Sequence, residues 1–181
     1  MTKKWTLRKT LDHFPQELES YPELIRNLLI ARGIVTKAEA EIYLKPDYER
    51  DLLDPFLMKD MQKAIDRLLL ALERGEKIII FGDYDADGIP GSAILAVFLS
   101  AINFTNYEVY IPDRHNEDYG LSEEKIKDFV ASGVKLIITI DCGITDVEEI
   151  RLAQSNGIDV VITDHHQIGR AHVWTPVTPS N

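Results

Sequence analysis

The sequence predicts an α/β fold in which a parallel sheet is flanked by helices, with an N-terminal helical appendage in front of it. Between residues 78 and 163, short apolar segments rich in β-branched residues alternate with longer segments of helical length. Strands that alternate with helices in this way form parallel sheets with right-handed crossovers. The expected elements are strand 78–81, helix 92–102, strand 107–111, helix 122–131, strand 135–140, helix 145–156 and strand 159–163.

The composition suits one good-sized globular domain with a small appendage, since 45% of the 181 residues are hydrophobic and 28% are charged. The net charge of −10 argues against non-specific nucleic-acid binding by the whole surface, but leaves open a local basic track or phosphate held through bound metal. A single cysteine, Cys142, excludes an internal disulfide framework and fits a reducing compartment. With no signal peptide and no apolar run long enough to span a bilayer, a cytoplasmic protein without a membrane partner is expected.

Residues 1–55 are expected to form the N-terminal helical appendage. Apolar residues recur at helical spacing over residues 24–29, and Gly33 follows at the position of a C-cap. Residues 36–39 (Thr-Lys-Ala-Glu) match a capping box, which opens a second short helix that ends before Pro46.

Two short helices joined by a turn are also typical of DNA-reading helix-turn-helix motifs. The second helix, however, carries Glu39 and Glu41 where a DNA reader carries Arg, Lys, Asn or Gln. The sequence therefore favours packing over DNA reading for these helices.

Residues 56–167 are expected to form the α/β domain. It opens with a strongly amphipathic helix over residues 61–72, which Gly75 ends. Residues 168–181 have no periodicity and resemble the read-through translation of a sequencing-library adapter. We therefore predict that they are a non-native tail and that the natural chain continues past Gln167.

An acidic turn follows the first strand of the predicted sheet. Residues 78–81 are an unbroken β-branched and aromatic run, typical of a strand buried on both faces, and Asp83, Asp85 and Asp87 follow at every second position. Repulsion between three nearby carboxylates is costly unless a cation or solvent offsets it. Open α/β sheets bind ligands at the carboxyl ends of their strands, so we predict a divalent-metal site here. A solvated acidic turn remains open on these residues alone.

Two other kinds of site fit this turn poorly. Its Asp-x-Asp-x-Asp-Gly pattern begins like an EF-hand calcium loop, but that loop needs a glutamate where this chain has Ile94, and a helix where it has a strand. A phosphate-binding P-loop is excluded because no G-x-x-x-x-G-K-[ST] pattern occurs.

Acidic or imidazole side chains follow all four predicted strands, although strand ends usually carry turn residues such as glycine and asparagine. Collected at one edge of the sheet, these groups form a ligand cluster large enough for two cations. Carboxylates with some imidazole suit Mn²⁺ or Mg²⁺, and the histidines favour Mn²⁺. The strand-end segments are Asp83 to Asp87, Pro112 to Gly120, Asp141 to Gly143, and Asp164 to His166.

Two metal ions ~4 Å apart activate a water and stabilise charge on a phosphoryl oxygen, so phosphoester hydrolysis is the expected chemistry. Arg114 is placed to grip a phosphate oxygen, although a plain surface role is equally consistent with its position. The neighbouring acids favour metal ligation over simple capping for the pair His165 and His166. Cys142 has no base paired with it in the sequence, so a small buried residue is the preferred interpretation.

Four segments of the chain resemble the successive motifs of the DHH phosphoesterase superfamily, whose catalytic domain is Rossmann-like: GDYDADG, PDRHNEDYGL, TIDCGI and TDHH. The N-terminal helices and the run from LLIARGI to GDYDADG are similar to the RecJ branch of that superfamily, the single-strand-specific DNA exonucleases. The resemblance covers about residues 5 to 167.

The resemblance implies a set of site residues. It implies Asp85, Asp87, Asp141, His165 and His166 as Mn²⁺ (or Mg²⁺) ligands for two ions. Asp83 and Asp164 are expected to support the site. We assign the catalytic roles to Asp83, Asp164 and His165, and substrate binding to Arg114 and Tyr119.

Two departures from the family pattern bear on this interpretation. Pro90-Gly91-Ser92 stands where relatives usually show a small hydroxyl pair, so the entry into the following helix is expected to differ slightly. The family's further metal-binding aspartate, its second catalytic domain and its oligonucleotide-binding domain lie beyond the end of this chain. We therefore expect the chain by itself to be inactive or nearly so.

The resemblance implies the N-terminal part of a 5′–3′ exonuclease that hydrolyses single-stranded DNA in recombination and repair. A single-strand-binding protein and a helicase are the expected partners besides DNA. Two alternatives stay open: a DHH phosphodiesterase acting on oligoribonucleotides or cyclic dinucleotides, and a non-catalytic DHH scaffold. The helical appendage argues against the first, and the presence of the expected ligands up to Gln167 argues against the second.

Overall fold

The fold was analysed in a computed structural model of the chain, which describes residues 15–117 and 119–166. The chain divides into two compact units, and the division falls between Asp54 and Pro55. The segment 168–181, predicted to be a non-native tail, lies outside the described residues.

The first unit is helical. Its described elements are the short 3₁₀ helix η1 (Gln16–Leu18) and the helices α1 (Glu23–Ile30), α2 (Lys37–Leu44) and α3 (Tyr48–Asp51). Leu18, Leu29 and Ala40 are fully buried and form its small core.

The ends of these helices follow their local sequence. The predicted capping box is confirmed, because the Thr36 hydroxyl accepts the Glu39 N–H and the Glu39 carboxylate accepts the Thr36 N–H. Helix α3 was not predicted; the Asp47 carboxylate opens it by accepting the N–H groups of Glu49 and Arg50.

The second unit is a four-stranded sheet with helices on both faces, which confirms the predicted fold class. All strand pairs are parallel and the strand order is β2-β1-β3-β4. Its elements are η2 (Pro55–Leu57), α4 (Met61–Arg74), β1 (Lys77–Gly82), α5 (Gly88–Ala101), β2 (Tyr107–Tyr110), α6 (Glu123–Ala131), β3 (Val134–Ile140), α7 (Val147–Ser155) and β4 (Asp159–Thr163).

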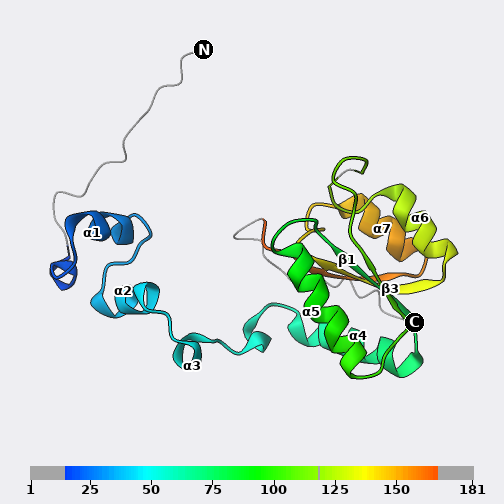
Figure 1. Cartoon of the computed structure of the whole chain (residues 1–181), viewed down its shortest axis with the longest axis horizontal. Helices are drawn as coiled ribbons and strands as arrows, with labels where there is room; N and C mark the ends of the chain where they lie inside the picture. The colour runs from blue at the N-terminus through cyan, green and yellow to red at the C-terminus, as the bar shows by residue number, and fades with distance from the viewer. Residues whose placement is uncertain (1–14, 118, 167–181) are drawn as a thin grey trace, which may run out of the picture. The chain divides into compact units, whose positions relative to one another are not determined.

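The two faces of the sheet carry separate apolar cores. Alternate residues of a strand point to opposite faces, so Ile79 and Phe81 join the core that includes α6 and α7, while Ile78 joins the core beneath α4. Figure 1 shows α6 and α7 on one side of the sheet and α4 and α5 on the other. As predicted, β1 is buried on both faces.

Helix α5 begins at Gly88, four residues before its predicted start at residue 92. The prediction treated Pro90 and Gly91 as helix breakers. Pro90 instead lies in the first turn of the helix, where no backbone N–H has an intrahelical partner, so its missing N–H costs nothing. The early start places the helix N-terminus directly after Asp87.

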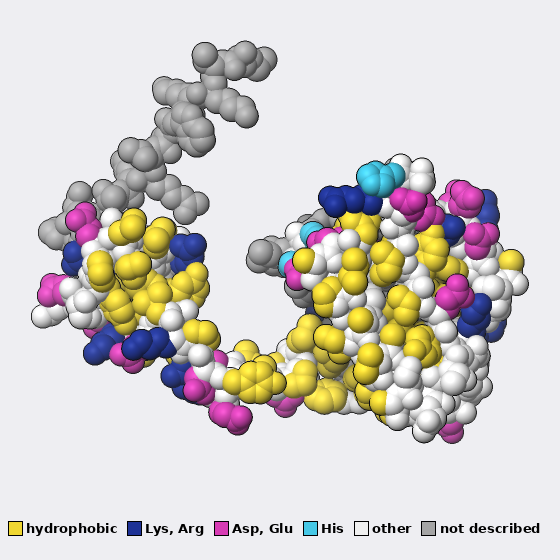
Figure 2. Space-filling view, in the orientation of Figure 1, with side chains coloured by type: hydrophobic (Ala, Val, Ile, Leu, Met, Phe, Trp, Pro, Cys, Tyr) yellow, Lys and Arg dark blue, Asp and Glu magenta, His cyan; other side chains and the backbone are white. Residues whose placement is uncertain are grey.

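The face over α4 and α5 is apolar. Ile94, Val97 and Phe98 are between 48% and 71% exposed, and hydrophobic side chains gather on this side of the unit in Figure 2. A cavity of about 370 Å³ lies between the two helices above β3 and β4. None of the described helices combines the length and the apolar character needed to cross a membrane.

Candidate metal centre

The strand register brings three aspartates to the same edge of the sheet. Gly82 pairs with Ile140, and Ile140 pairs with Thr163, at the last paired positions of β1, β3 and β4. The next residue in each strand is an aspartate: Asp83, Asp141 and Asp164. Because the strands are parallel, these three carboxylates emerge side by side at the carboxyl ends, as the sequence predicted.

The loop after β1 is held by hydrogen bonds to its own aspartates. Asp83 is buried, and its carboxylate accepts the Tyr84 N–H at 2.6 Å. The Asp85 carboxylate accepts the N–H groups of Gly88 and Asp87, and these bonds lower the pKa of Asp85 from its usual value. Asp85 therefore shapes the turn that begins α5.

Gly88 lets this loop close tightly. A Cβ atom at Gly88 would lie 2.4 Å from the backbone oxygen of Asp83, far inside van der Waals contact. No larger residue fits here without moving Asp83 or the first turn of α5.

Asp141 is the central carboxylate of the site. Its φ of 62° is left-handed, its side chain is 6% exposed, and among the described residues no hydrogen bond engages either carboxylate oxygen. Burial raises the pKa of Asp141, the nearby charge of Asp85 raises it further, and the two histidines after β4 act against this rise. A carboxylate buried in this way is costly, and a bound cation would reduce that cost.

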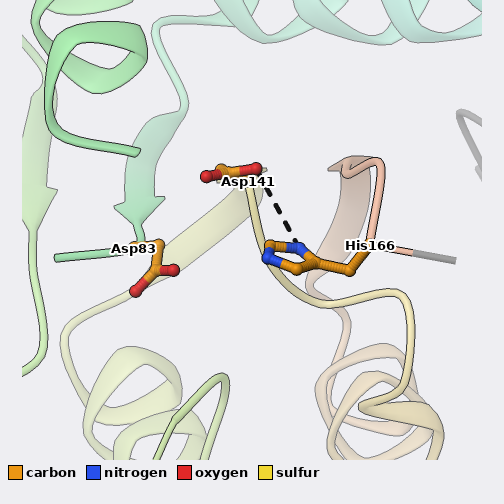
Figure 3. Close-up of side chains that lie close together, drawn as sticks. All are labelled: Asp83, Asp141 and His166. Carbon is orange, nitrogen blue, oxygen red and sulfur yellow. Dashed lines mark ion pairs between the residues drawn. The ribbon is translucent and has the colours of Figure 1, made fainter. Parts of the chain in front are cut away.

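The two histidines after β4 face this carboxylate. His165 Nε2 lies 3.0 Å and His166 Nδ1 lies 4.0 Å from the same Asp141 oxygen, and Figure 3 draws the second of these contacts. Asp164 holds His166, since its Oδ1 lies 2.7 Å from His166 Nδ1 and accepts the His166 N–H, while its Oδ2 accepts the Ile144 N–H. Burial alone would raise the pKa of Asp164, but these bonds outweigh burial and lower it.

Two groups of side chains are close enough to hold a cation each, and they share Asp141. The first group is Asp83, Asp141 and His166; the second is Asp87, Asp141 and His165; within each, the ligand atoms lie within 4.8 Å of one another. This donor set of carboxylate oxygens and imidazole nitrogens fits Mn²⁺. Four of the five predicted ligands are brought together in this way.

The fifth predicted ligand, Asp85, belongs to neither group, while Asp83, predicted to support the site, belongs to the first. The difference arises in the loop, because an Asp85 oxygen is engaged with backbone N–H groups at the start of α5. Asp85 still lies near enough to influence the pKa of Asp141. Its role as a ligand remains a prediction.

The loop after β2 brings the two predicted substrate-binding residues to the site. The Tyr119 hydroxyl donates to the backbone oxygen of Asp141 at 3.2 Å and lies 3.4 Å from His166 Nδ1. Burial raises the pKa of Tyr119, as does the charge of Asp83, so the phenol stays protonated. Arg114 is exposed and lies over the ring of Tyr84, with its guanidinium carbon 5.2 Å from the ring centroid.

Asp146 is a buried carboxylate at this edge that the sequence did not single out. It accepts the Leu121 N–H at 2.7 Å, and a Cβ atom at Gly120 would lie 2.4 Å from its Oδ2. Asp146 thus joins the loop that carries Tyr119 to the segment that follows Asp141. Its place directly before α7 is typical of a helix cap, and nothing in the sequence indicates this longer-range bond.

Cys142 is not poised for nucleophilic chemistry. It is 1% exposed within the core beneath α6 and α7, and its thiol lies 3.7 Å from the backbone oxygen of Phe81. Burial raises the pKa of the thiol. The preferred interpretation, a small buried residue, is confirmed.

Comparison with protein families matches residues 77–181 to the DHH family, N-terminal domain. The chain belongs to the DHH family. The match covers β1 to β4 and therefore all the residues of the candidate metal centre.

Individual relatives of this DHH chain point to one branch. It is 41% identical to the single-stranded-DNA-specific exonuclease RecJ of Bacillus subtilis over 146 residues, which are 81% of this chain and 18% of that protein. It is 32% identical to the same exonuclease of Escherichia coli over 162 residues, 90% of this chain and 27% of that protein. The chain thus spans less than a third of the length of these relatives.

Two solved structures are similar to this DHH chain. An exonuclease RecJ bound to manganese matches with a TM-score of 0.58 and 36% identity, over 68% of this chain and 33% of that one. RecJ from Thermus thermophilus in complex with Mn²⁺ matches with a TM-score of 0.58 and 30% identity, over 83% of this chain and 20% of that one.

Proposed function

We propose that this chain is the N-terminal part of a RecJ-type exonuclease that hydrolyses single-stranded DNA from the 5′ end, using two Mn²⁺ ions. The observation that carries the proposal is Asp141, whose buried carboxylate belongs to both candidate ligand groups. The RecJ relatives, two of them solved with manganese, support the substrate class and the metal. The same resemblance implies a role in recombination and repair, with a single-strand-binding protein and a helicase as partners. The single cysteine supports a cytoplasmic location.

Each residue has a defined part in this proposal. Asp83, Asp87, Asp141, His165 and His166 hold the ions, with Asp85 as a further predicted ligand. Bound manganese supplies an activated water and stabilises the charge that develops on the phosphoryl oxygen. Asp164 orients His166 through the 2.7 Å contact, as carboxylates do for metal-binding histidines. Arg114 and Tyr119 would bind a phosphate of the DNA beside the site.

Calorimetric titration with MnCl₂ tests the metal part of the proposal. We expect two ions per chain for the wild type and no binding at either group for Asp141→Asn, because both groups need that carboxylate. Asp113→Asn is the matched control, since Asp113 is an exposed carboxylate outside both groups. A single ion per chain, or undiminished binding by Asp141→Asn, would contradict the shared-ligand proposal.

Nuclease assays with end-labelled single-stranded DNA test the activity. We expect the 181-residue chain to be inactive or nearly so with Mn²⁺, and a chain extended to the length of its relatives to release a 5′ label first. Processive digestion by the short chain would refute the first expectation. Preference of the extended chain for dinucleotides or cyclic dinucleotides would replace the exonuclease proposal with the small-substrate alternative. Full metal occupancy without any hydrolysis would favour a scaffold.

A further inference from the structure

Tyr84, the residue between Asp83 and Asp85, has no assigned part in the site, although its ring makes two contacts there. The guanidinium carbon of Arg114 lies 5.2 Å from its ring centroid, within the range of a cation–π interaction. The ring of Tyr119 meets Tyr84 edge to face, at 6.5 Å between centroids and 83° between planes. Tyr84 therefore lies between two residues of the loop that follows β2.

The contacts of Tyr84 extend through Tyr119 to the metal centre. The Tyr119 ring lies 5.9 Å from the His166 ring, also edge to face, and its hydroxyl donates to the backbone oxygen of Asp141. At the other end of Tyr84, the backbone N–H donates to the Asp83 carboxylate. Tyr84 thus contacts Asp83 directly and His166 through the ring of Tyr119, and Arg114 lies over the ring of Tyr84.

Among the residues that the structure describes, no hydrogen bond or ion pair engages the Arg114 guanidinium, although the neighbouring loop carries three aspartates. An exposed arginine loses side-chain entropy when it binds a ligand, and contact with a ring removes part of that freedom beforehand. The N–H donors that do not face the ring remain available for a phosphate.

We propose that Tyr84 is a positioning residue: its ring holds the Arg114 guanidinium in place to bind a phosphate of the single-stranded DNA beside the metal centre. The inference rests on the proposed function, which assigns the phosphate to Arg114. It requires the ring of Tyr84 and not its hydroxyl. Phenylalanine at this position should therefore preserve the effect, whereas leucine, which fills similar space without a π face, should lose it.

Two measurements on the whole chain test this inference. The first is the NMR chemical shift of the Arg114 Nε–H group in the metal-free chain, because paramagnetic Mn²⁺ would broaden this signal. We expect a ring-current shift in the wild type and in Tyr84→Phe, and its loss in Tyr84→Leu. The second is the affinity for a fluorescein-labelled oligo-dT with Mn²⁺ present, measured by anisotropy for Tyr84→Leu, Tyr84→Phe, Arg114→Ala and the double variant Tyr84→Leu/Arg114→Ala.

For binding, we expect Tyr84→Leu to weaken affinity about two- to five-fold, the size of an exposed cation–π contact, and Tyr84→Phe to restore it. In the Arg114→Ala background, Tyr84→Leu should add nothing, because the residue it positions is gone. Additive losses in the double variant, or an Arg114 shift that is unchanged in Tyr84→Leu, would overturn the positioning role.

A different result would contradict the proposed function. If Arg114→Ala leaves DNA affinity unchanged while the ring-current shift is present in the wild type, Arg114 does not bind the phosphate. In that case the stacking geometry is correct and the phosphate assignment is wrong, and the inference about Tyr84 falls with it.

Discussion

Asp141 combines a left-handed backbone with a buried carboxylate. Aspartate and asparagine tolerate φ near 60° better than other residues with side chains, so the sequence can place a ligand where the chain must turn sharply after β3. The same turn takes the side chain out of solvent, where its nearest described partners are the two histidines after β4. The charged form of Asp141 is therefore unfavourable unless cations are bound.

This burial predicts an unusual response to Asp141→Asn. In EDTA, we expect the variant to be more stable than the wild type by about 1 kcal/mol, because the burial penalty on the Asp141 charge is removed. Added Mn²⁺ should raise the melting temperature of the wild type and leave that of the variant unchanged. Thermal melts followed by circular dichroism measure both effects. A variant less stable than the wild type in EDTA would show that Asp141 has a stabilising partner of its own.

Replacing Gly88 should lower stability, in contrast to Asp141→Asn. Gly88→Ala places a methyl group 2.4 Å from the Asp83 backbone oxygen, so the loop after β1 must open. We expect a loss of about 1–3 kcal/mol in stability, as for other overpacked sites, and weaker Mn²⁺ binding because Asp83 and Asp87 move apart. Gly91→Ala is the comparison, since its closest contact is a single side-chain methyl group of Ile140, and its cost should be smaller. Urea unfolding and manganese titration of both variants give the two quantities.

At the scale of elements, the sequence predicted the features that depend on the local pattern of apolar and acidic residues. The run from Ile78 to Phe81 is apolar at every position, so a strand buried on both faces followed directly. Aspartates after successive strands predicted a shared edge, because all strands of a parallel sheet end on the same side. The strand order β2-β1-β3-β4 was beyond reach, since it depends on which strands pair across long separations.

The details of the site that the sequence did not predict depend on the path of the loops. Asp83 rather than Asp85 belongs to a ligand group with Asp141, and Asp85 instead accepts the N–H groups of Asp87 and Gly88 at the start of α5. The sequence did not predict these bonds, because Pro90 suggested that the helix starts later than Gly88. The Leu121 N–H donates to Asp146, and Arg114 lies over the ring of Tyr84. Each contact joins residues that are far apart in the sequence, so no spacing in the sequence indicates it.

Helix α4 is anchored at the opposite end of the sheet by one arginine. Arg67 is 13% exposed and bonds to Glu76 at 2.6 Å, Asp159 at 2.5 Å and the Lys135 backbone oxygen at 3.1 Å. These contacts tie α4 to the beginnings of β1, β3 and β4.

Removing this anchor should lower stability without affecting the metal centre. We expect Arg67→Met to cost about 2–4 kcal/mol in urea unfolding, because Asp159 loses its contact with Arg67 and the 14% exposed Glu76 keeps only the longer contact with Arg74. Arg74→Met is the control: its contact to Glu76 is 3.6 Å and its side chain is 62% exposed, so its cost should stay below about 0.5 kcal/mol. Manganese affinity of the folded protein should be unchanged in both. A change in affinity for Arg67→Met would mean that the two ends of the sheet are coupled.

On the scale of the whole molecule, the metal centre belongs to one of the two compact units. Every residue of both ligand groups lies after Pro55. We expect a chain of residues 55–181 to bind Mn²⁺ within about two-fold of the full chain, a difference of at most ~0.4 kcal/mol. Calorimetry on the two chains measures this, and a larger loss would assign the helical unit a part in forming the site.

The ligand groups draw on the loops after β1, β3 and β4, and none of their members follows β2. In the described sheet, β2 and β4 are the two outermost strands, each hydrogen-bonded on one side only. Bound manganese would therefore stabilise β4 against local opening but not β2. Amide hydrogen exchange should report it: chelation should speed exchange in β4 while β2, an internal reference on the same sheet, keeps its rate.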